Sequence, residues 1–215
     1  MIAAARRRRT GWMLLGILGC MLLAPPVGQA AAVGSYVSKY QGVEVSRTQA
    51  ANVGAYEHLI RYFSSISYCK PRHKVNPDFI SALMLAESGG DPFAVSEKEA
   101  IGLCQLLYPT ARMAARELLA KGIEVRYVSK SRLRDLQPVD LFDPAVNILL
   151  TCYLISKYNL AYNGRLDLVV AAWNAGQGAI LDGRLPQYPE TLDLIGKVNG
   201  YLLAFLKQKN GRSGG

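Results

Sequence analysis

The chain has 215 residues, of which 50% are hydrophobic and 19% are charged. A half-apolar chain of this length can bury one sizeable core, which excludes disorder over most of its length. A coiled-coil rod would need far more charge and a multi-domain protein more residues, so one domain is expected.

The first 30 residues are predicted to form a secretory signal peptide. Arg6 to Arg9 precede an uncharged apolar run over 11–24, and small residues follow at 28–32. A basic, then apolar, then small-residue order is typical of an exported protein. An uncleaved membrane anchor is the alternative, although the run is shorter than the roughly 20 residues that span a bilayer. Lipidation at Cys20 is a further alternative.

The chain is basic, with 25 lysines and arginines against 16 acidic residues and a net charge of +9. Residues 1–30 hold four arginines and no acidic residue, so their removal leaves +5. This charge suits a partner that is a polyanion, such as cell-wall polymer or anionic lipid, and export disfavours nucleic acid. The charge could equally serve solubility alone.

The part after the signal peptide is expected to be helical. Residues 31–66 predict an aperiodic leader and then a helix from Thr48 to Ile66, where Val53, Ile60 and Phe63 share one stripe. The predicted catalytic domain covers residues 67–208. Its first helix starts at Asn76-Pro77-Asp78, an N-cap followed by proline and an acid, and ends at Gly89-Gly90.

Further helices are predicted over 109–121, 144–158 and 166–173, and from Pro189 onward. Because residues 144–158 are apolar on nearly every side, that helix should lie at the buried centre. Glu124 to Val128 is the only strand candidate, so the fold class is all-α. The polar, glycine-rich residues 209–215 predict a disordered tail.

Three cysteines, Cys69, Cys104 and Cys152, follow the signal peptide. A Cys69–Cys152 disulfide and three buried free thiols are both compatible with their number. With two histidines and no CxxC motif in the sequence, neither a metal ion nor a cofactor is expected.

The candidate catalytic residue is Glu87. Ile80, Met84 and Glu87 recur at helical spacing, so the carboxyl group shares the buried stripe of its helix. Apolar surroundings and the negative end of the helix dipole both raise a carboxyl pKa, which suits a general acid working near neutral pH. A glutamate at the edge of the stripe, or one paired with a lysine, is the alternative.

Four motifs follow one another between Asn76 and Leu206. They are Glu87-Ser88-Gly89-Gly90-Asp91-Pro92-Phe93-Ala94-Val95-Ser96, Gly102-Leu103-Cys104-Gln105, Ala171-Ala172-Trp173-Asn174-Ala175-Gly176, and Pro189-Glu190-Thr191 with Lys197-Val198. Together, in this order, they resemble the lytic transglycosylases with the goose-type lysozyme-like fold, also called the SLT family.

The resemblance implies a helical lysozyme-like domain with a substrate groove, which cleaves peptidoglycan without water. Glu87 would protonate the glycosidic oxygen between N-acetylmuramic acid and N-acetylglucosamine. It would then act as a base on the muramyl C6 hydroxyl, which leaves a 1,6-anhydromuramyl end. The expected location is the periplasm, the expected partner is the glycan strand, and a monomer is expected.

The resemblance also implies five substrate-binding residues, each with a structural alternative. Ser96 would bond the catalytic carboxyl or the substrate N-acetyl group, or it could cap its own turn. Gln105 would bind glycan or bond the backbone. Trp173, where the family has tyrosine, could donate to the acid, stack on a sugar or fill the core. Asn174 would touch the sugar or, more in keeping with its position, hold the turn backbone. Glu190 would support the groove or complement the helix dipole.

Two other functions stay open. One is a hydrolytic muramidase that uses Asp91 or Glu97 as a base. The other is a non-catalytic wall-binding subunit of an envelope secretion or conjugation machine, suggested by Trp173 and by Cys104, which stands where the family has methionine. The span from Lys121 to Pro138 looks longer than in the family, which predicts an altered rim of the groove.

Overall fold

The computed structural model describes residues 27–212. Predictions for residues 1–26, which include the basic and apolar regions of the signal peptide and the lipidation of Cys20, lie outside that range. The helices and strands in chain order are α1 (Val27–Lys39), α2 (Arg47–Gly54), α3 (Glu57–Ser64), α4 (Pro77–Ser88), β1 (Ala100–Ile101), β2 (Leu106–Leu107), α5 (Tyr108–Ala120), α6 (Lys130–Arg134), the 3₁₀ helix η1 (Pro138–Phe142), α7 (Pro144–Ala161), α8 (Leu166–Ala175), the 3₁₀ helix η2 (Gln177–Ala179) and α9 (Pro189–Arg212).

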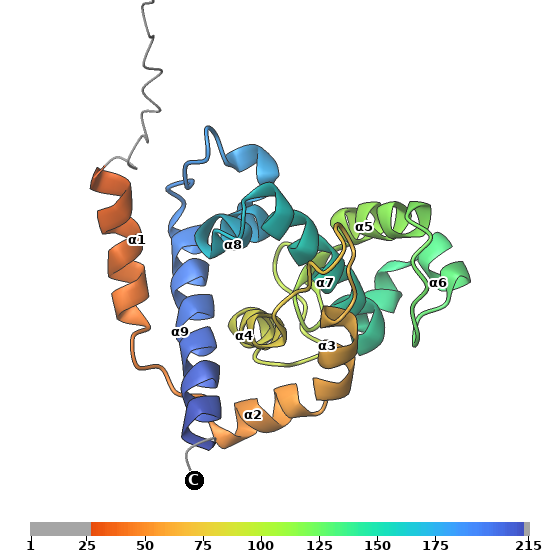
Figure 1. The fold of residues 1–215 in the computed structure, drawn as a ribbon, viewed down its shortest axis with the longest axis horizontal. Helices are drawn as coiled ribbons and strands as arrows, with labels where there is room; N and C mark the ends of the chain where they lie inside the picture. The colour runs from red at the N-terminus through yellow and green to blue at the C-terminus, as the bar shows by residue number, and fades with distance from the viewer. Residues whose placement is uncertain (1–26, 213–215) are drawn as a thin grey trace, which may run out of the picture.

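The helices surround a single apolar core, as the all-α prediction requires. Figure 1 shows α4 end-on, enclosed by α2, α3, α7, α8 and α9. Residues 145–156 and Tyr158 of α7 are buried, so the helix that is apolar on nearly every side is central, as predicted. The helices α2 and α3 contribute Val53, Ile60 and Phe63 to the same core.

Helix α4 has the ends that its sequence predicts. The Asn76 side chain accepts a hydrogen bond from the Asp78 N–H at 2.8 Å, and Pro77 occupies the first turn. At the other end the backbone of Gly89 is in the left-handed conformation, with φ of 65°, which is unfavourable for residues that have a Cβ atom. The cap at Asn76 fixes where the helix begins and Gly89 fixes where it ends, which places Glu87 in its last turn.

A small antiparallel ribbon follows α4, in which Ala100 pairs with Leu107 and Ile101 with Leu106. The sequence did not reveal it, because strands of two residues are too short to show an alternating pattern. The strand candidate at 124–128 is wrong, since that segment is an irregular loop.

The loop that contains the ribbon is fixed to α7 by Asn147, which is completely buried. Its Oδ1 accepts the Cys104 N–H at 3.0 Å, while its Nδ2 donates to the carbonyls of Ile101 and Leu141, each at 2.9 Å. Gly102 makes this approach possible, because a Cβ there would lie 2.4 Å from the Leu141 oxygen. The ribbon therefore has one position relative to the central helix.

The N-terminal region differs from its prediction. The expected helix over 48–66 is divided into α2 and α3, and the poor helix former Gly54 ends the first of them. Helix α1 begins within the last residues of the predicted signal peptide, continues into the expected leader and packs on α9. A Cβ on Gly196 would lie 2.5 Å from the Tyr36 oxygen, and one on Gly200 would lie 2.7 Å from the Tyr40 oxygen. Val33, Tyr36 and Val37 recur at helical spacing on the side of α1 that faces the core and α9, so the sequence did carry a signal for this helix.

The C-terminal tail was predicted wrongly over residues 209–212, which are helical because α9 runs to Arg212. Lys209 pairs with Asp78 at 2.6 Å, which holds the last turns of α9 against α4. Residues 213–215 lie outside the described part of the chain. Of the two alternatives for the cysteines, the structure has free thiols, but only Cys104 and Cys152 are buried, and Cys69 is half-buried. No helix among residues 27–212 is both long and apolar enough to cross a membrane.

Replacement of Asn147 by leucine should destabilise the fold by about 3 kcal/mol, because one N–H and two carbonyl groups lose buried partners. Thr151→Val is the matched control on α7. It removes a buried hydroxyl that donates to the Asn147 carbonyl, and about 1 kcal/mol is expected. Urea unfolding measures both free energies, and equal losses would contradict the role given to the Asn147 amide.

Candidate active site

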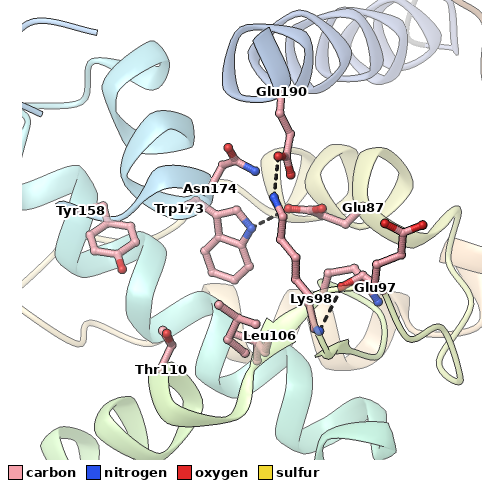
Figure 2. A pocket seen from close by; sticks show the side chains of 13 residues that line it. Glu87, Glu97, Lys98, Leu106, Thr110, Tyr158, Trp173, Asn174 and Glu190 are labelled. Atoms are coloured by element: carbon pink, nitrogen blue, oxygen red, sulfur yellow. Dashed lines mark hydrogen bonds and ion pairs between the residues drawn. The ribbon is translucent and has the colours of Figure 1, made fainter. Parts of the chain in front are cut away.

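A groove of about 470 Å³ lies where the end of α4 meets α8, the start of α9 and the ribbon. The six residues singled out in the sequence all line it: Glu87, Ser96, Gln105, Trp173, Asn174 and Glu190. The structure therefore brings together four motifs that are up to about a hundred residues apart in the chain. Figure 2 shows how several of these side chains converge.

Glu87 lies at the inner wall of the groove and keeps partial exposure toward it. Ile80 and Met84, the preceding residues of its stripe, are completely buried. The pKa of Glu87 is raised to about 7, mainly by burial and to a smaller extent by the nearby Glu190, while Trp173 and Lys197 oppose the rise. The carboxyl group is thus divided between its protonated and ionised forms near neutral pH.

Trp173, in the last turns of α8, donates a hydrogen bond from its indole Nε1 to Glu87 Oε1 at 2.7 Å (Figure 2). The ring is half-buried and packs against the core while it lines the groove. Of the three possibilities for Trp173, donation to the acid and packing against the core are both observed. The indole N–H stabilises the ionised carboxylate and so limits the rise of the Glu87 pKa.

Ser96 and Gln105 hold the loop around the ribbon. The Ser96 hydroxyl oxygen accepts the Ala100 N–H at 3.0 Å, which is the turn-capping alternative. The Gln105 Nε2 donates to the carbonyls of Ala94 and Gly102, at 3.1 and 3.0 Å. Gln105 thereby bonds the backbone, although it also lines the groove.

Asn174 and Glu190 connect the end of α8 to the start of α9. Asn174 Oδ1 accepts from the buried Thr191 hydroxyl at 2.6 Å, so the amide binds a side chain of α9. Glu190 pairs with Lys98 Nζ at 2.5 Å. The Lys98 ammonium and the Asn174 amide together hold the pKa of Glu190 below its usual value.

Several residues of the groove were not predicted from the sequence, and they lie in the turn before β1, in β1 and β2, and in α5 and α7. They are Lys98, Ala100, Leu106, Leu107, Thr110 and Tyr158. Tyr158 could not be singled out because α7 is buried on almost every side. Lys98 follows the motif residue Ser96 by two positions, and this proximity was the one feature of the sequence that could have indicated a place in the groove.

Two of the departures from the family pattern lie away from the groove. Cys104 is completely buried under the ribbon, where burial raises its thiol pKa far above the usual value. Asp91 is exposed, and its Oδ1 accepts the Phe93 N–H at 2.8 Å, as a turn residue does. Neither side chain is among the described residues that line the groove.

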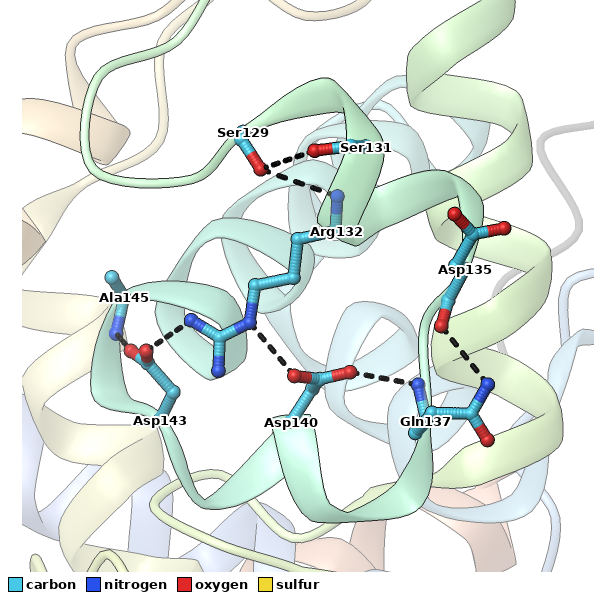
Figure 3. A network of polar contacts seen from close by, with 8 residues as sticks. All are labelled: Ser129, Ser131, Arg132, Asp135, Gln137, Asp140, Asp143 and Ala145. Atoms are coloured by element: carbon cyan, nitrogen blue, oxygen red, sulfur yellow. Dashed lines mark hydrogen bonds and ion pairs between the residues drawn. The ribbon is translucent and has the colours of Figure 1, made fainter.

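The span from Lys121 to Pro138 also differs from its prediction, because none of its residues lines the groove that the described part of the chain forms. It contains α6, which Arg132 ties to the start of α7 (Figure 3). The Arg132 guanidinium binds Asp140 at 2.7 Å and also binds Asp143, whose other oxygen caps α7. This span is therefore anchored beside α5, outside the groove.

Within residues 27–212, no group of three or more histidine, cysteine, aspartate or glutamate side chains is placed to hold a metal ion. The chemistry available in the groove is that of a carboxyl group that titrates near neutrality, with amide, hydroxyl and ammonium groups around it.

A comparison with protein families finds that residues 64–188 match the model of the transglycosylase SLT domain. The match covers more than half of the chain. This protein belongs to the SLT transglycosylase family. Its mostly helical fold is the one expected for that family, and the prediction made from the four motifs is confirmed at this level.

Individual proteins that are similar to this SLT protein are lytic transglycosylases. Membrane-bound lytic murein transglycosylase C of Edwardsiella ictaluri is 32% identical over 128 residues, which cover 56% of this chain and 33% of that protein. An inactive mutant of lytic transglycosylase Slt from Pseudomonas aeruginosa superposes with a TM-score of 0.51 and 22% identity, over 86% of this chain and 25% of that one.

The 70 kDa soluble lytic transglycosylase of Escherichia coli superposes with a TM-score of 0.53 and 16% identity, over 84% of this chain and 33% of that one. At these identities the solved structures establish the fold alone. The chain spans a third or less of the length of the relatives it matches.

The Glu87 carboxyl should titrate with a midpoint near pH 7, which ¹³C NMR of glutamate-labelled protein measures directly. Trp173→Phe removes the N–H that stabilises the ionised form, so the midpoint should move to higher pH. Trp173→Tyr is the matched variant, since its hydroxyl can still donate, and its midpoint should lie closer to that of the wild type. A wild-type midpoint near 4.5, or a downward shift in Trp173→Phe, would contradict the described environment.

Proposed function

We propose that this SLT protein is a peptidoglycan lytic transglycosylase, which cleaves the β-1,4 bond between N-acetylmuramic acid and N-acetylglucosamine and leaves a 1,6-anhydromuramyl end. The observation that carries the proposal is a half-buried carboxyl group with a pKa of about 7, facing a groove in a domain of this family. The name of the relative from Edwardsiella ictaluri, a membrane-bound murein transglycosylase, supports this substrate and a site of action in the cell envelope.

Protonated Glu87 acts first as a general acid. It donates its proton to the glycosidic oxygen as the bond to muramyl C1 breaks and the sugar gains oxocarbenium character. The proton transfer is favourable near neutral pH because the carboxyl pKa matches the working pH. Once the proton has left, the Trp173 indole N–H stabilises the carboxylate that remains.

The same carboxylate then acts as a base. It removes the proton of the muramyl C6 hydroxyl, whose oxygen bonds to C1 and closes the anhydro ring, so Glu87 returns to its protonated form. Between the two steps, the substrate's own N-acetyl oxygen stabilises C1. One carboxyl group thereby serves both proton transfers, and no water enters the product.

The other groove residues bind the strand in this proposal. The Ser96 hydroxyl accepts from its own turn, so its proton is available to a substrate N-acetyl group. The Gln105 Nε2 is occupied by two carbonyls, which leaves its Oε1 to accept from a sugar hydroxyl. Trp173 serves the acid directly, and Asn174 joins α8 to α9 through the Thr191 hydroxyl. Glu190 pairs with Lys98 at the exposed edge of the groove.

Two observations favour the transglycosylase over a hydrolytic muramidase. Asp91 is engaged in its own turn, and the remaining candidate base, Glu97, lies on an exposed turn at the edge of the groove. The groove and the raised pKa of Glu87 likewise favour an enzyme over a purely structural subunit of a secretion or conjugation machine. Binding to such a machine is compatible with activity.

Glu87→Gln should lower the turnover of purified sacculi by about 100-fold or more, because the amide cannot protonate the glycosidic oxygen. Glycan binding should be retained. Glu99→Gln is the matched control, a carboxylate on the exposed turn before β1, and its turnover should stay within about twofold of the wild type. Retention of more than a tenth of the turnover in Glu87→Gln would contradict the assignment.

The muropeptides released by the wild type should be lighter by one water than hydrated reducing ends, as mass spectrometry of the digest measures. Glu97→Gln should give the same products. Hydrated ends that disappear in Glu97→Gln would move the assignment to a muramidase.

The kcat/KM for wall fragments should fall tenfold per pH unit above about pH 7, because only the protonated carboxyl can donate and its pKa is about 7. A decline centred near pH 4.5 would show that Glu87 is an ordinary exposed carboxylate or is not the acid.

A further inference from the structure

A tight turn from Ser96 to Ala100 presents Lys98 at the edge of the groove. The Ser96 N–H donates to the Ala100 carbonyl at 3.0 Å, and the Ala100 N–H returns to the Ser96 hydroxyl at 3.0 Å. The Glu99 N–H donates to the Ser96 carbonyl at 2.9 Å. These bonds fix the backbone, so the position from which the Lys98 side chain extends is set by the fold.

From this turn Lys98 reaches Glu190 on α9, and Figure 2 shows the pair between the two walls, beside Glu87. Both partners line the same groove as Glu87, and their charged atoms are 2.5 Å apart. A glycan strand that delivers its linkage to Glu87 must therefore meet the pair of Lys98 and Glu190.

The pair is weak enough for a substrate to exchange it. The side chains of Lys98 and Glu190 are 71% and 64% exposed, and an ion pair at such a site contributes about 1 kcal/mol or less. Asn174 also stabilises the Glu190 carboxylate, which keeps a polar partner when the lysine leaves. Lys98 can thus change partners at little cost.

The charges of the groove indicate what its new partner would be. Among the described residues that line the groove, Glu87, Glu97 and Glu190 are acidic, and Lys98 is the one basic side chain. The sugar backbone of peptidoglycan is neutral, and its carboxylates belong to the peptide on each muramyl residue, or to the lactyl group where no peptide is attached. An ammonium group attracts such a carboxylate as a point charge.

We propose that Lys98 is a specificity residue, which leaves Glu190 and binds a carboxylate on the muramyl side chain of the strand. This inference rests on the proposed function, since it takes peptidoglycan to be the ligand of the groove. It predicts that the protein distinguishes wall glycan from a chitin oligosaccharide, which has a similar β-1,4-linked backbone of N-acetyl sugars but no carboxylate.

Binding measured in the Glu87→Gln background tests the inference without turnover. Isothermal titration calorimetry would compare a muramyl-peptide tetrasaccharide with chitotetraose. Lys98→Met should lower the affinity for the muramyl ligand about tenfold and leave the affinity for chitotetraose unchanged, so the preference falls about tenfold. Lys98→Arg keeps the positive charge and should retain most of the preference. Glu190→Gln frees the lysine and should raise muramyl affinity by up to about fivefold.

Two outcomes would overturn the inference in different ways. If Lys98→Met weakens both ligands equally, or leaves the preference unchanged, the role of Lys98 is refuted while the proposed function stands. If the Glu87→Gln parent binds neither ligand, the proposed function falls and the inference with it. Thermal unfolding of each variant serves as the control, and no change is expected at such exposed side chains.

Discussion

The burial of one carboxyl group, with a single indole N–H to stabilise its charge, is the constraint on which the rest of the structure depends. Burial alone would keep Glu87 protonated and unable to act as a base. A normally exposed carboxylate would be ionised and unable to act as an acid. The contact between Trp173 Nε1 and Glu87 Oε1, at 2.7 Å, balances the two effects and leaves the pKa at about 7. A tryptophan can thus provide the donor where related proteins have a tyrosine hydroxyl.

Much of the surrounding structure fixes the walls of the groove. Asn147 holds the ribbon against the central helix, and Gly102 allows the backbones to approach. Ser96 and Gln105 each form hydrogen bonds with the backbone of their own loop. These residues are conformationally restrained before substrate arrives, which lowers the entropy lost on binding. The walls are therefore rigid where the linkage must be oriented, and the exchangeable contact is the exposed pair at the edge.

The sequence predicts the parts of the fold that depend on strong local signals. The ends of α4 follow from Asn76, Pro77 and Gly89, and the position of Glu87 follows from them. Helix α1 escaped prediction although Val33, Tyr36 and Val37 recur at helical spacing, because its first turn overlaps the predicted signal peptide. Lys98 escaped because an exposed lysine in a loop has no pattern of its own. Its relation to Glu190, 92 residues later, exists only in the folded chain.

The central claim is that Glu87 faces the linkage that is cut. A crystal structure of the Glu87→Gln variant with a muramyl tetrasaccharide in the groove would test it most directly. We expect one glycosidic oxygen within about 2.6 to 3.2 Å of the side-chain amide at position 87, with the muramyl C6 hydroxyl on the same side. A strand that leaves this side chain without a sugar neighbour, or that binds elsewhere on the domain, would contradict it.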